Sequence, residues 1–126
     1  MEIDIRLVIA YPEVSNPALT RFLLHPVGDE KFSLFCRAVS DELPVDAAKS
    51  LLKSLTNIDA IWVEFIQGEP LIGYLGQRRH LIIPYIVLLR GLVNPTQGEW
   101  LTVGEVFENK FVGQDKEILL GMAKKV

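Results

Sequence analysis

The alternation of apolar and polar residues is interrupted at positions 81–89, where nine apolar residues follow one another as LIIPYIVLL. A strand with one face in water alternates, so this run indicates an element covered on both faces, by helices of the same chain or by another subunit. Pro84 favours a different element, because proline cannot donate a ladder hydrogen bond but suits the first turn of a helix ending at Leu92. We interpret the run as a strand, with the helix as the alternative.

Five further strands are predicted from shorter patterns. Residues 3–10 alternate apolar and polar side chains, as expected of a strand with one buried face. Residues 19–27 and 32–39 are predicted to form a hairpin about the charged turn 28–31. Residues 60–66 and 71–75 are predicted to form a second hairpin, and the turn 76–79 would lead from it into the apolar run as a meander.

Three helices are predicted, one central and two near the C-terminus. Residues 45–55 place apolar side chains at helical spacing, with Asp46, Lys49 and Lys53 on the opposite side. Thr102 and Glu105 have the spacing of a capping box, which predicts a short helix through residue 109. Residues 114–125 are predicted to form the last helix.

This order of elements predicts an α+β fold, with a mostly antiparallel sheet of about six strands, one central helix and two C-terminal helices packed on it. Short connections favour antiparallel neighbours, since parallel strands need longer crossovers. With 126 residues and a mass of 14.2 kDa, residues 1–126 are expected to form a single domain.

The composition is apolar for a small domain, with 49% hydrophobic and 23% charged residues and a mean hydropathy of +0.25. Apolar surface is therefore expected to remain for a partner, which is either a second copy of the chain or another protein. The net charge of −3 disfavours nucleic-acid binding. Residues 102–125 resemble a helix-turn-helix in outline, but the second helix mixes lysines with Asp115 and Glu117, so a nucleic-acid role is the last alternative.

No cofactor, metal site or catalytic residue is expected. Cys36 with His25 and His80 gives too few and too scattered ligands for zinc. Cys36 is predicted to be a buried, unreactive thiol on a strand, and a single cysteine fits a reducing compartment. The N-terminus resembles a first strand more than a secretory signal, so a cytoplasmic location without membrane contact is expected.

One polar cluster precedes the apolar run. Adjacent arginines supply planar forked donors and a histidine adds another, so the cluster could bind an anionic group at the rim of an apolar pocket. The alternative is a solvated turn. The candidate ligand-binding residues are Arg78, Arg79 and His80, with Trp62, Tyr74 and Tyr85 lining the pocket.

The absence of a recognisable motif favours a small non-catalytic binding or assembly domain, acting as a homo-oligomer or as a subunit of a larger complex. An enzyme is the less favoured interpretation. The first alternative is a small-ligand-binding or enzymatic domain that recognises an anionic group through Arg78, Arg79 and His80. Nucleic-acid binding is the second alternative.

Overall fold

The computed structural model describes residues 2–75 and 77–126. These residues form one mixed sheet of nine strands, with three α-helices and two short 3₁₀ helices. The strands are β1 (Glu2–Tyr11), β2 (Arg21–Val27), β3 (Lys31–Ser33), β4 (Phe35–Val39), β5 (Glu64–Gln67), β6 (Leu71–Leu75), β7 (Arg78–Leu88), β8 (Glu99–Thr102) and β9 (Lys110–Phe111). The helices are η1 (Pro17–Leu19), α1 (Pro44–Thr56), η2 (Ala60–Trp62), α2 (Val103–Glu108) and α3 (Asp115–Ala123).

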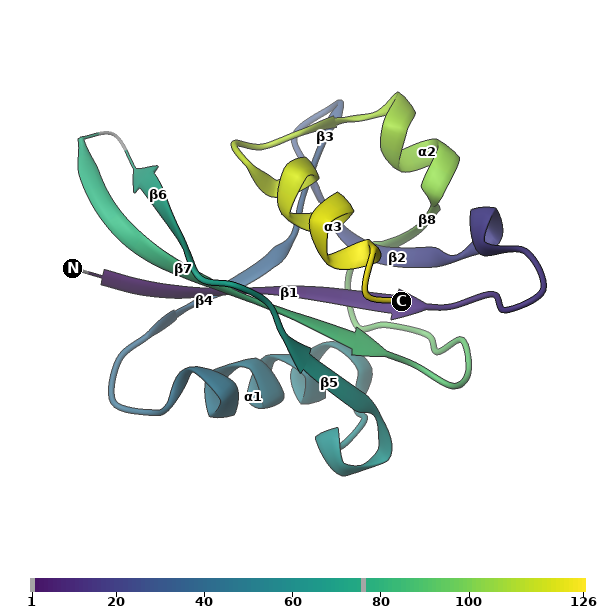
Figure 1. Cartoon of the computed structure of the whole chain (residues 1–126), viewed down its shortest axis with the longest axis horizontal. Coiled ribbons are helices and arrows are strands. Elements are labelled where there is room, and N and C mark those ends of the chain that lie inside the picture. The colour runs from purple at the N-terminus through teal and green to yellow at the C-terminus, as the bar shows by residue number, and fades with distance from the viewer. Residues whose placement is uncertain (1, 76) are drawn as a thin grey trace.

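The centre of the sheet is a parallel pair, β1 and β7, in register from Glu2 with His80 to Ala10 with Leu88. In Figure 1, α1 and α3 lie on opposite sides of this pair. The residues of β7 from Ile82 to Val87 are buried. The prediction of a strand covered on both faces is confirmed, and its cover comes from helices of the same chain.

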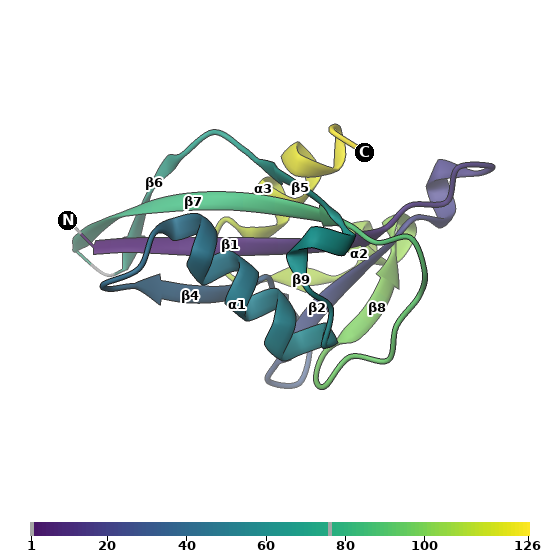
Figure 2. The same cartoon turned by 90° about the horizontal axis from the view of Figure 1, so that it is seen from below.

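Two apolar cores result, one on each face of the sheet. On β1, Ile5, Leu7 and Ile9 point toward α1, whereas Val8 and Ala10 point toward α3. Figure 2 shows α1 crossing the layer formed by β1 and β4. The buried residues of α1 are Ala47, Ala48, Leu52, Leu55 and Thr56, and those of α3 are Asp115, Ile118, Leu119 and Met122.

Pro84 fits the central strand because of a local interruption in its neighbours. β6 pairs with β7 at positions 78–82 and β5 pairs with it at 85–88, so the two partners leave Pro84 between them. The Pro84 carbonyl accepts a hydrogen bond of 2.9 Å from the Gly68 N–H at this gap. In a strand the N–H and C=O of one residue point the same way. The side of Pro84 that lacks an N–H therefore faces the gap between β5 and β6, where the strand pairing is already interrupted.

The α+β class and the three helices were predicted correctly, but the strand number and pairing were not. Within the described residues, β5 and β6 both pair with β7 and not with each other, so the predicted hairpin of residues 60–66 with 71–75 is wrong. Residues 60–62 form η2 rather than strand. β6 and β7 do form a hairpin, and Gly76, the first residue of its predicted turn, lies outside the described residues.

The first predicted hairpin is also divided. β3 pairs with β2, as expected, but after Leu34 the chain crosses to pair β4 with β1. The strands β8 and β9 were not predicted; β8 adds to the edge of β2 and β9 pairs in parallel with β3. A mostly antiparallel sheet of six strands is therefore corrected to a mixed sheet of nine.

The helix boundaries follow the expected local signals. Asn57 ends α1 in the left-handed conformation, with φ of 60°, and its N–H donates to the Lys53 carbonyl. Thr102 and Glu105 form the predicted capping box at the start of α2. Across the described part of the chain, no helix has the length and apolar character needed to cross a membrane.

Candidate functional site

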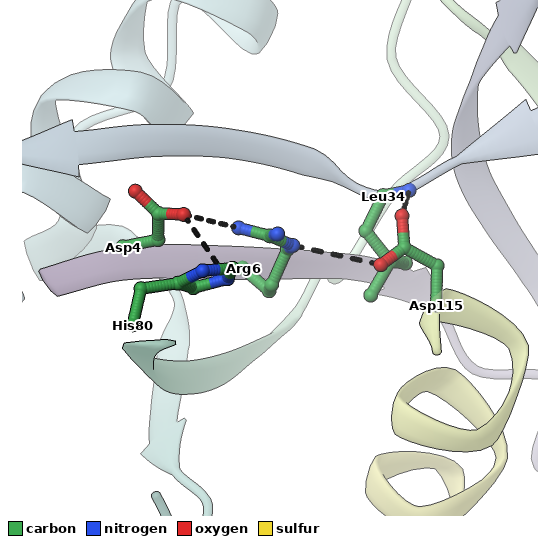
Figure 3. A network of polar contacts seen from close by, with 5 residues as sticks. All are labelled: Asp4, Arg6, Leu34, His80 and Asp115. Atoms are coloured by element: carbon green, nitrogen blue, oxygen red, sulfur yellow. Dashed lines mark hydrogen bonds and ion pairs between the residues drawn. The ribbon is translucent and has the colours of Figure 1, made fainter. Parts of the chain in front are cut away.

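A polar network interrupts the apolar face of the sheet beside the start of α3. Asp4 and Arg6 lie on the same face of β1 as Val8 and Ala10, because alternate residues of a strand share a face. The apolar residues of α3 cover Val8 and Ala10, whereas Arg6 meets Asp115 at the first turn of the helix. Figure 3 shows the network, which His80 joins from β7.

The contacts of this network are longer than close charged hydrogen bonds, which span about 2.7–2.9 Å. Arg6 Nε lies 3.5 Å from Asp115 Oδ1, and Arg6 Nη1 lies 3.5 Å from Asp4 Oδ2. His80 Nε2 lies 3.6 Å from the same Asp4 oxygen. A guanidinium carries five N–H donors, so Arg6 retains donors for a further group.

Asp115 is held more firmly by the backbone. Its Oδ2 accepts a hydrogen bond of 2.9 Å from the N–H of Leu34, the residue between β3 and β4. Burial raises the pKa of the Asp115 carboxyl, and the Leu34 N–H and the Arg6 charge oppose that rise without cancelling it. The carboxyl is thus a partly desolvated acceptor at the edge of the network.

His80 is buried, with a side chain that is 8% exposed. Its Nε2 has no hydrogen-bond partner among the described residues, and a buried unpaired nitrogen costs free energy. Gly73 lies opposite His80 on β6 and makes room for the ring, since a Cβ on Gly73 would come within 2.8 Å of Nε2. The imidazole therefore occupies space that a side chain at position 73 would fill.

A cavity of about 460 Å³ opens over this network. Arg6 and Cys36 border it from the paired strands β1 and β4, His80 and Tyr74 from the β7–β6 hairpin, and Asp115 from α3. Cys36 is exposed, so the prediction of a buried thiol is wrong. Cys36 is paired in register with Arg6, and β4 is an edge strand at this point, which leaves the thiol open to the cavity.

The thiol is nevertheless not activated. Desolvation by neighbouring atoms raises the pKa of Cys36, and the Arg6 charge lowers it by less. Within residues 2–75 and 77–126, no three His, Cys, Asp or Glu side chains are grouped so as to hold a metal ion.

The six residues predicted to bind a ligand do not form one site. His80 and Tyr74 border the cavity, and Arg78 lies two residues before His80 on the same face of β7. Arg78 is highly exposed and its Nη1 lies 3.6 Å from Glu2 Oε1.

The remaining three candidates lie away from the cavity. Arg79 and Tyr85 belong to the other face of β7, where Tyr85 is buried in the core beneath α1. Trp62 is exposed on η2. A run of neighbouring residues on a strand alternates between faces, so adjacent arginines cannot both point at one ligand.

Sequence reasoning missed Asp4, Arg6 and Asp115. A signal was present on β1, because Asp4 and Arg6 are the polar positions of an alternating strand that continues into Val8 and Ala10. Where the side chains of a strand face change from apolar to charged, the element that packs over the apolar part is expected to end. The partner Asp115 carried no such signal, because its position depends on the docking of α3.

Comparison with solved structures identifies the fold. The chain matches a C. elegans Ap4A hydrolase over 99% of its own length and 97% of the other chain, at 13% identity and a TM-score of 0.77. It matches the E. coli dihydroneopterin triphosphate pyrophosphohydrolase over 98% and 96%, at 14% identity and a TM-score of 0.75. It matches the NUDIX domain of Shewanella oneidensis NrtR, solved with ADP-ribose, over 98% and 86%, at 11% identity and a TM-score of 0.70. The chain has a Nudix-like fold.

The Nudix-like fold corrects the functional prediction. Two of these neighbours are hydrolases and the third holds a small anionic ligand, which contradicts the interpretation as a non-catalytic assembly domain. The alternative of a small-ligand-binding or enzymatic domain agrees better with them. No family model matches the sequence, and no curated protein matches it either.

Proposed function

We infer that this protein binds a small ligand made of a polar heterocyclic ring and a phosphate group, with the ring in the cavity beside Arg6 and Asp115. The observation that carries this inference is the incomplete pairing of Arg6. Its two carboxylate contacts are both 3.5 Å long, and it borders a cavity of about 460 Å³ that can admit a ring. A hydrogen-bond acceptor of the ligand, at a shorter distance from the Arg6 guanidinium, would use N–H donors that the two carboxylates bond only weakly.

The charges of the network favour a ring over a phosphate inside the cavity. Asp4 and Asp115 offset the Arg6 charge, so a phosphate there would meet two carboxylates. Arg6 as a donor beside Asp115 as an acceptor complements a ring edge that carries both an acceptor nitrogen and an N–H group. The neighbouring structures are named for Ap4A, ADP-ribose and dihydroneopterin triphosphate, each of which joins such a ring to phosphates.

Arg78 is the candidate partner for the phosphate. It lies two residues from His80 on β7, a distance of roughly 6.6 Å along a strand, and it projects into solvent at the same face. Its existing partner Glu2 is itself exposed, so exchanging that contact for a phosphate requires little desolvation. His80, which the sequence also indicated, would serve the ring rather than the phosphate.

Hydrolysis of the bound ligand is the second candidate function. It is favoured by the two hydrolases among the neighbouring structures, which are named for phosphate-bearing compounds. Cleavage of one phosphoanhydride bond by water would convert ADP-ribose to AMP and ribose 5-phosphate, and Ap4A to AMP and ATP or to two ADP. Chromatographic detection of these products distinguishes hydrolysis from binding alone.

The test is isothermal titration of the protein with ADP-ribose, Ap4A, AMP and inorganic phosphate. We expect the three ring-containing ligands to bind and inorganic phosphate to bind much more weakly. Arg6→Gln should weaken ring binding by about 10- to 100-fold, the worth of one hydrogen bond to a charged group. Arg37→Gln is the matched control, because Arg37 lies on the opposite face of β4 beside Glu42 and away from the cavity.

A cavity-filling variant provides a second, independent measurement. Cys36 is exposed and borders the cavity on an edge strand, so the larger side chain of Cys36→Trp should block the cavity and abolish ring binding. Cys36→Ser, with a side chain of similar size, should leave ring binding unchanged. Thermal unfolding checks that each variant is folded. Equal binding by the wild type and both Arg6→Gln and Cys36→Trp would exclude this cavity as the ligand site.

A further inference from the structure

The short helix η2 presents two large apolar side chains to solvent. Ile61 is 83% exposed and Trp62 is 70% exposed, although both belong to a segment whose neighbours Ala60 and Val63 pack against the core beneath α1. This surface lies on the α1 face of the sheet, opposite the ligand cavity beside α3. Any role of Trp62 is therefore separate from the proposed ligand site.

Two hollows border η2. One, of about 750 Å³, lies between α1 and β5 and is bordered by Lys49, Ile61 and Phe65. The other, of about 390 Å³, is bordered by Trp62, Arg90 and Leu92. Leu92 is itself 46% exposed, which extends the apolar surface beyond η2. The two hollows beside Ile61 and Trp62 can receive apolar side chains from a partner at two places.

The charges at these hollows are mainly positive. Lys49 and Lys53 border the first hollow and Arg90 the second, while Asp59 borders both. Lys53 Nζ lies 3.1 Å from Asp59 Oδ1, so these two charges offset each other. Across the described ranges, Lys49 and Arg90 take part in no ion pair. The surface is thus locally positive on a chain whose net charge is −3.

We propose that the surface formed by Lys49, Ile61, Trp62, Arg90 and Leu92 docks an acidic segment of another protein that carries apolar anchor side chains. The apolar anchors would enter the hollows beside Ile61 and Trp62, and carboxylates would meet Lys49 and Arg90. Exposed tryptophan and arginine are the residue types that contribute most to protein–protein binding. The two unpaired cations select an acidic partner over a basic one, since like charges across an interface oppose binding.

The charge pattern also argues against the other occupants. A nucleic acid would be repelled by the net charge of −3 and would meet a patch with few cations. A second copy of the chain would bring the same positive surface to a symmetric interface, because the same patch faces itself in a twofold dimer.

The experiment uses a short fluorescein-labelled peptide in which Leu and Trp alternate with Glu and Asp. Two control peptides replace the acids with Lys or replace the apolar residues with Ser. We expect the acidic apolar peptide alone to bind, and Trp62→Ala to weaken that binding by at least about tenfold, as for an interface anchor. Phe107→Ala is the matched control, because Phe107 is 61% exposed and belongs to α2, outside this surface.

Charge reversal tests the selectivity for acids. The double variant Lys49→Glu and Arg90→Glu should lose the acidic peptide and gain the lysine peptide, whereas Lys124→Glu on another surface should change neither. These residues are exposed, so the variants are expected to fold, and thermal unfolding verifies it. The proposal would be overturned if Trp62→Ala left peptide binding unchanged, or if the acidic and lysine peptides bound equally. It would also be overturned if Trp62 were required for dimerisation of the free chain or for binding of an oligonucleotide.

Discussion

Arg6 and Asp115 form an ion pair, with 3.5 Å between Nε and Oδ1, that joins the first strand to the start of the last helix. Both side chains are largely buried, at 15% and 10% exposure, so water screens the pair only partly. The pair lies where the apolar contact of α3 with the sheet ends and the polar cavity begins. Changes at these two residues are expected to affect the ligand site and the stability together.

Asp115 should make the stability of the protein depend on acid pH. Burial raises the pKa of its carboxyl above the ordinary 3.8, so the folded chain keeps a proton that the unfolded chain has already lost. The contribution of this group to the free energy of unfolding therefore falls as the pH rises from the pKa of the unfolded chain through the raised pKa of the folded chain. Above the raised pKa the contribution is constant. Asp115→Asn cannot titrate, so its stability should not show this decrease with pH. Its amide oxygen can still accept the hydrogen bond from the Leu34 N–H.

The measurement is urea unfolding of the wild type and Asp115→Asn from about pH 3 to about pH 7. We expect the variant to gain stability relative to the wild type as pH rises through the acid range. A stability difference that is the same at every pH would show that the Asp115 carboxyl has the same pKa in both states.

Cys36 should react slowly for an exposed cysteine. Its pKa is raised above the ordinary 9.0 by desolvation, and the thiolate is the reactive form. Alkylation followed by mass spectrometry should be slower in the folded protein than in the unfolded chain at neutral pH. Arg6→Gln should slow it further, because the Arg6 charge lowers the pKa of this thiol. An unchanged rate in Arg6→Gln would contradict the coupling between the two residues.

Gly73→Ala should destabilise the protein and displace His80. The new Cβ would lie 2.6 Å from Ile82 Cδ1 and 2.8 Å from His80 Nε2, closer than van der Waals contact allows. Overpacking of this kind costs about 1–3 kcal/mol, measured by thermal or urea unfolding. Gly91→Ala is the control, because nothing lies within 4 Å of the Cβ that it adds. Equal losses of stability in Gly73→Ala and Gly91→Ala would contradict the steric explanation.

Leu119→Ala should test whether α3 is an integral part of the fold. Leu119 is fully buried against the β1 and β7 face, so its truncation should lower the free energy of unfolding by about 2–5 kcal/mol. Leu43→Ala, at a side chain that is 65% exposed, should change it by no more than about 0.5 kcal/mol. Similar losses in both variants would mean that α3 does not anchor the core.

The sequence alone was sufficient for features that depend on near neighbours. The helix α1, the capping box of Thr102 and Glu105, and the buried strand β7 were all predicted from the spacing of residues close together in the chain. The helix, the capping box and the strand could be predicted because helical and strand periodicity, and capping hydrogen bonds, are local interactions. His80 and Tyr74, which the sequence indicated as ligand-binding residues, border the cavity, and their binding of a ligand stays a prediction.

Only the tertiary structure decided which strands pair and where the cavity lies. The parallel pairing of β1 with β7, and the shared pairing of β5 and β6 along β7, join residues far apart in the chain, and many partners satisfy the same apolar pattern. For the same reason the sequence left open that α1 and α3, rather than another subunit, cover β7. Asp115 reaches Arg6 because α3 docks its apolar side on the sheet, and no local pattern encodes that register.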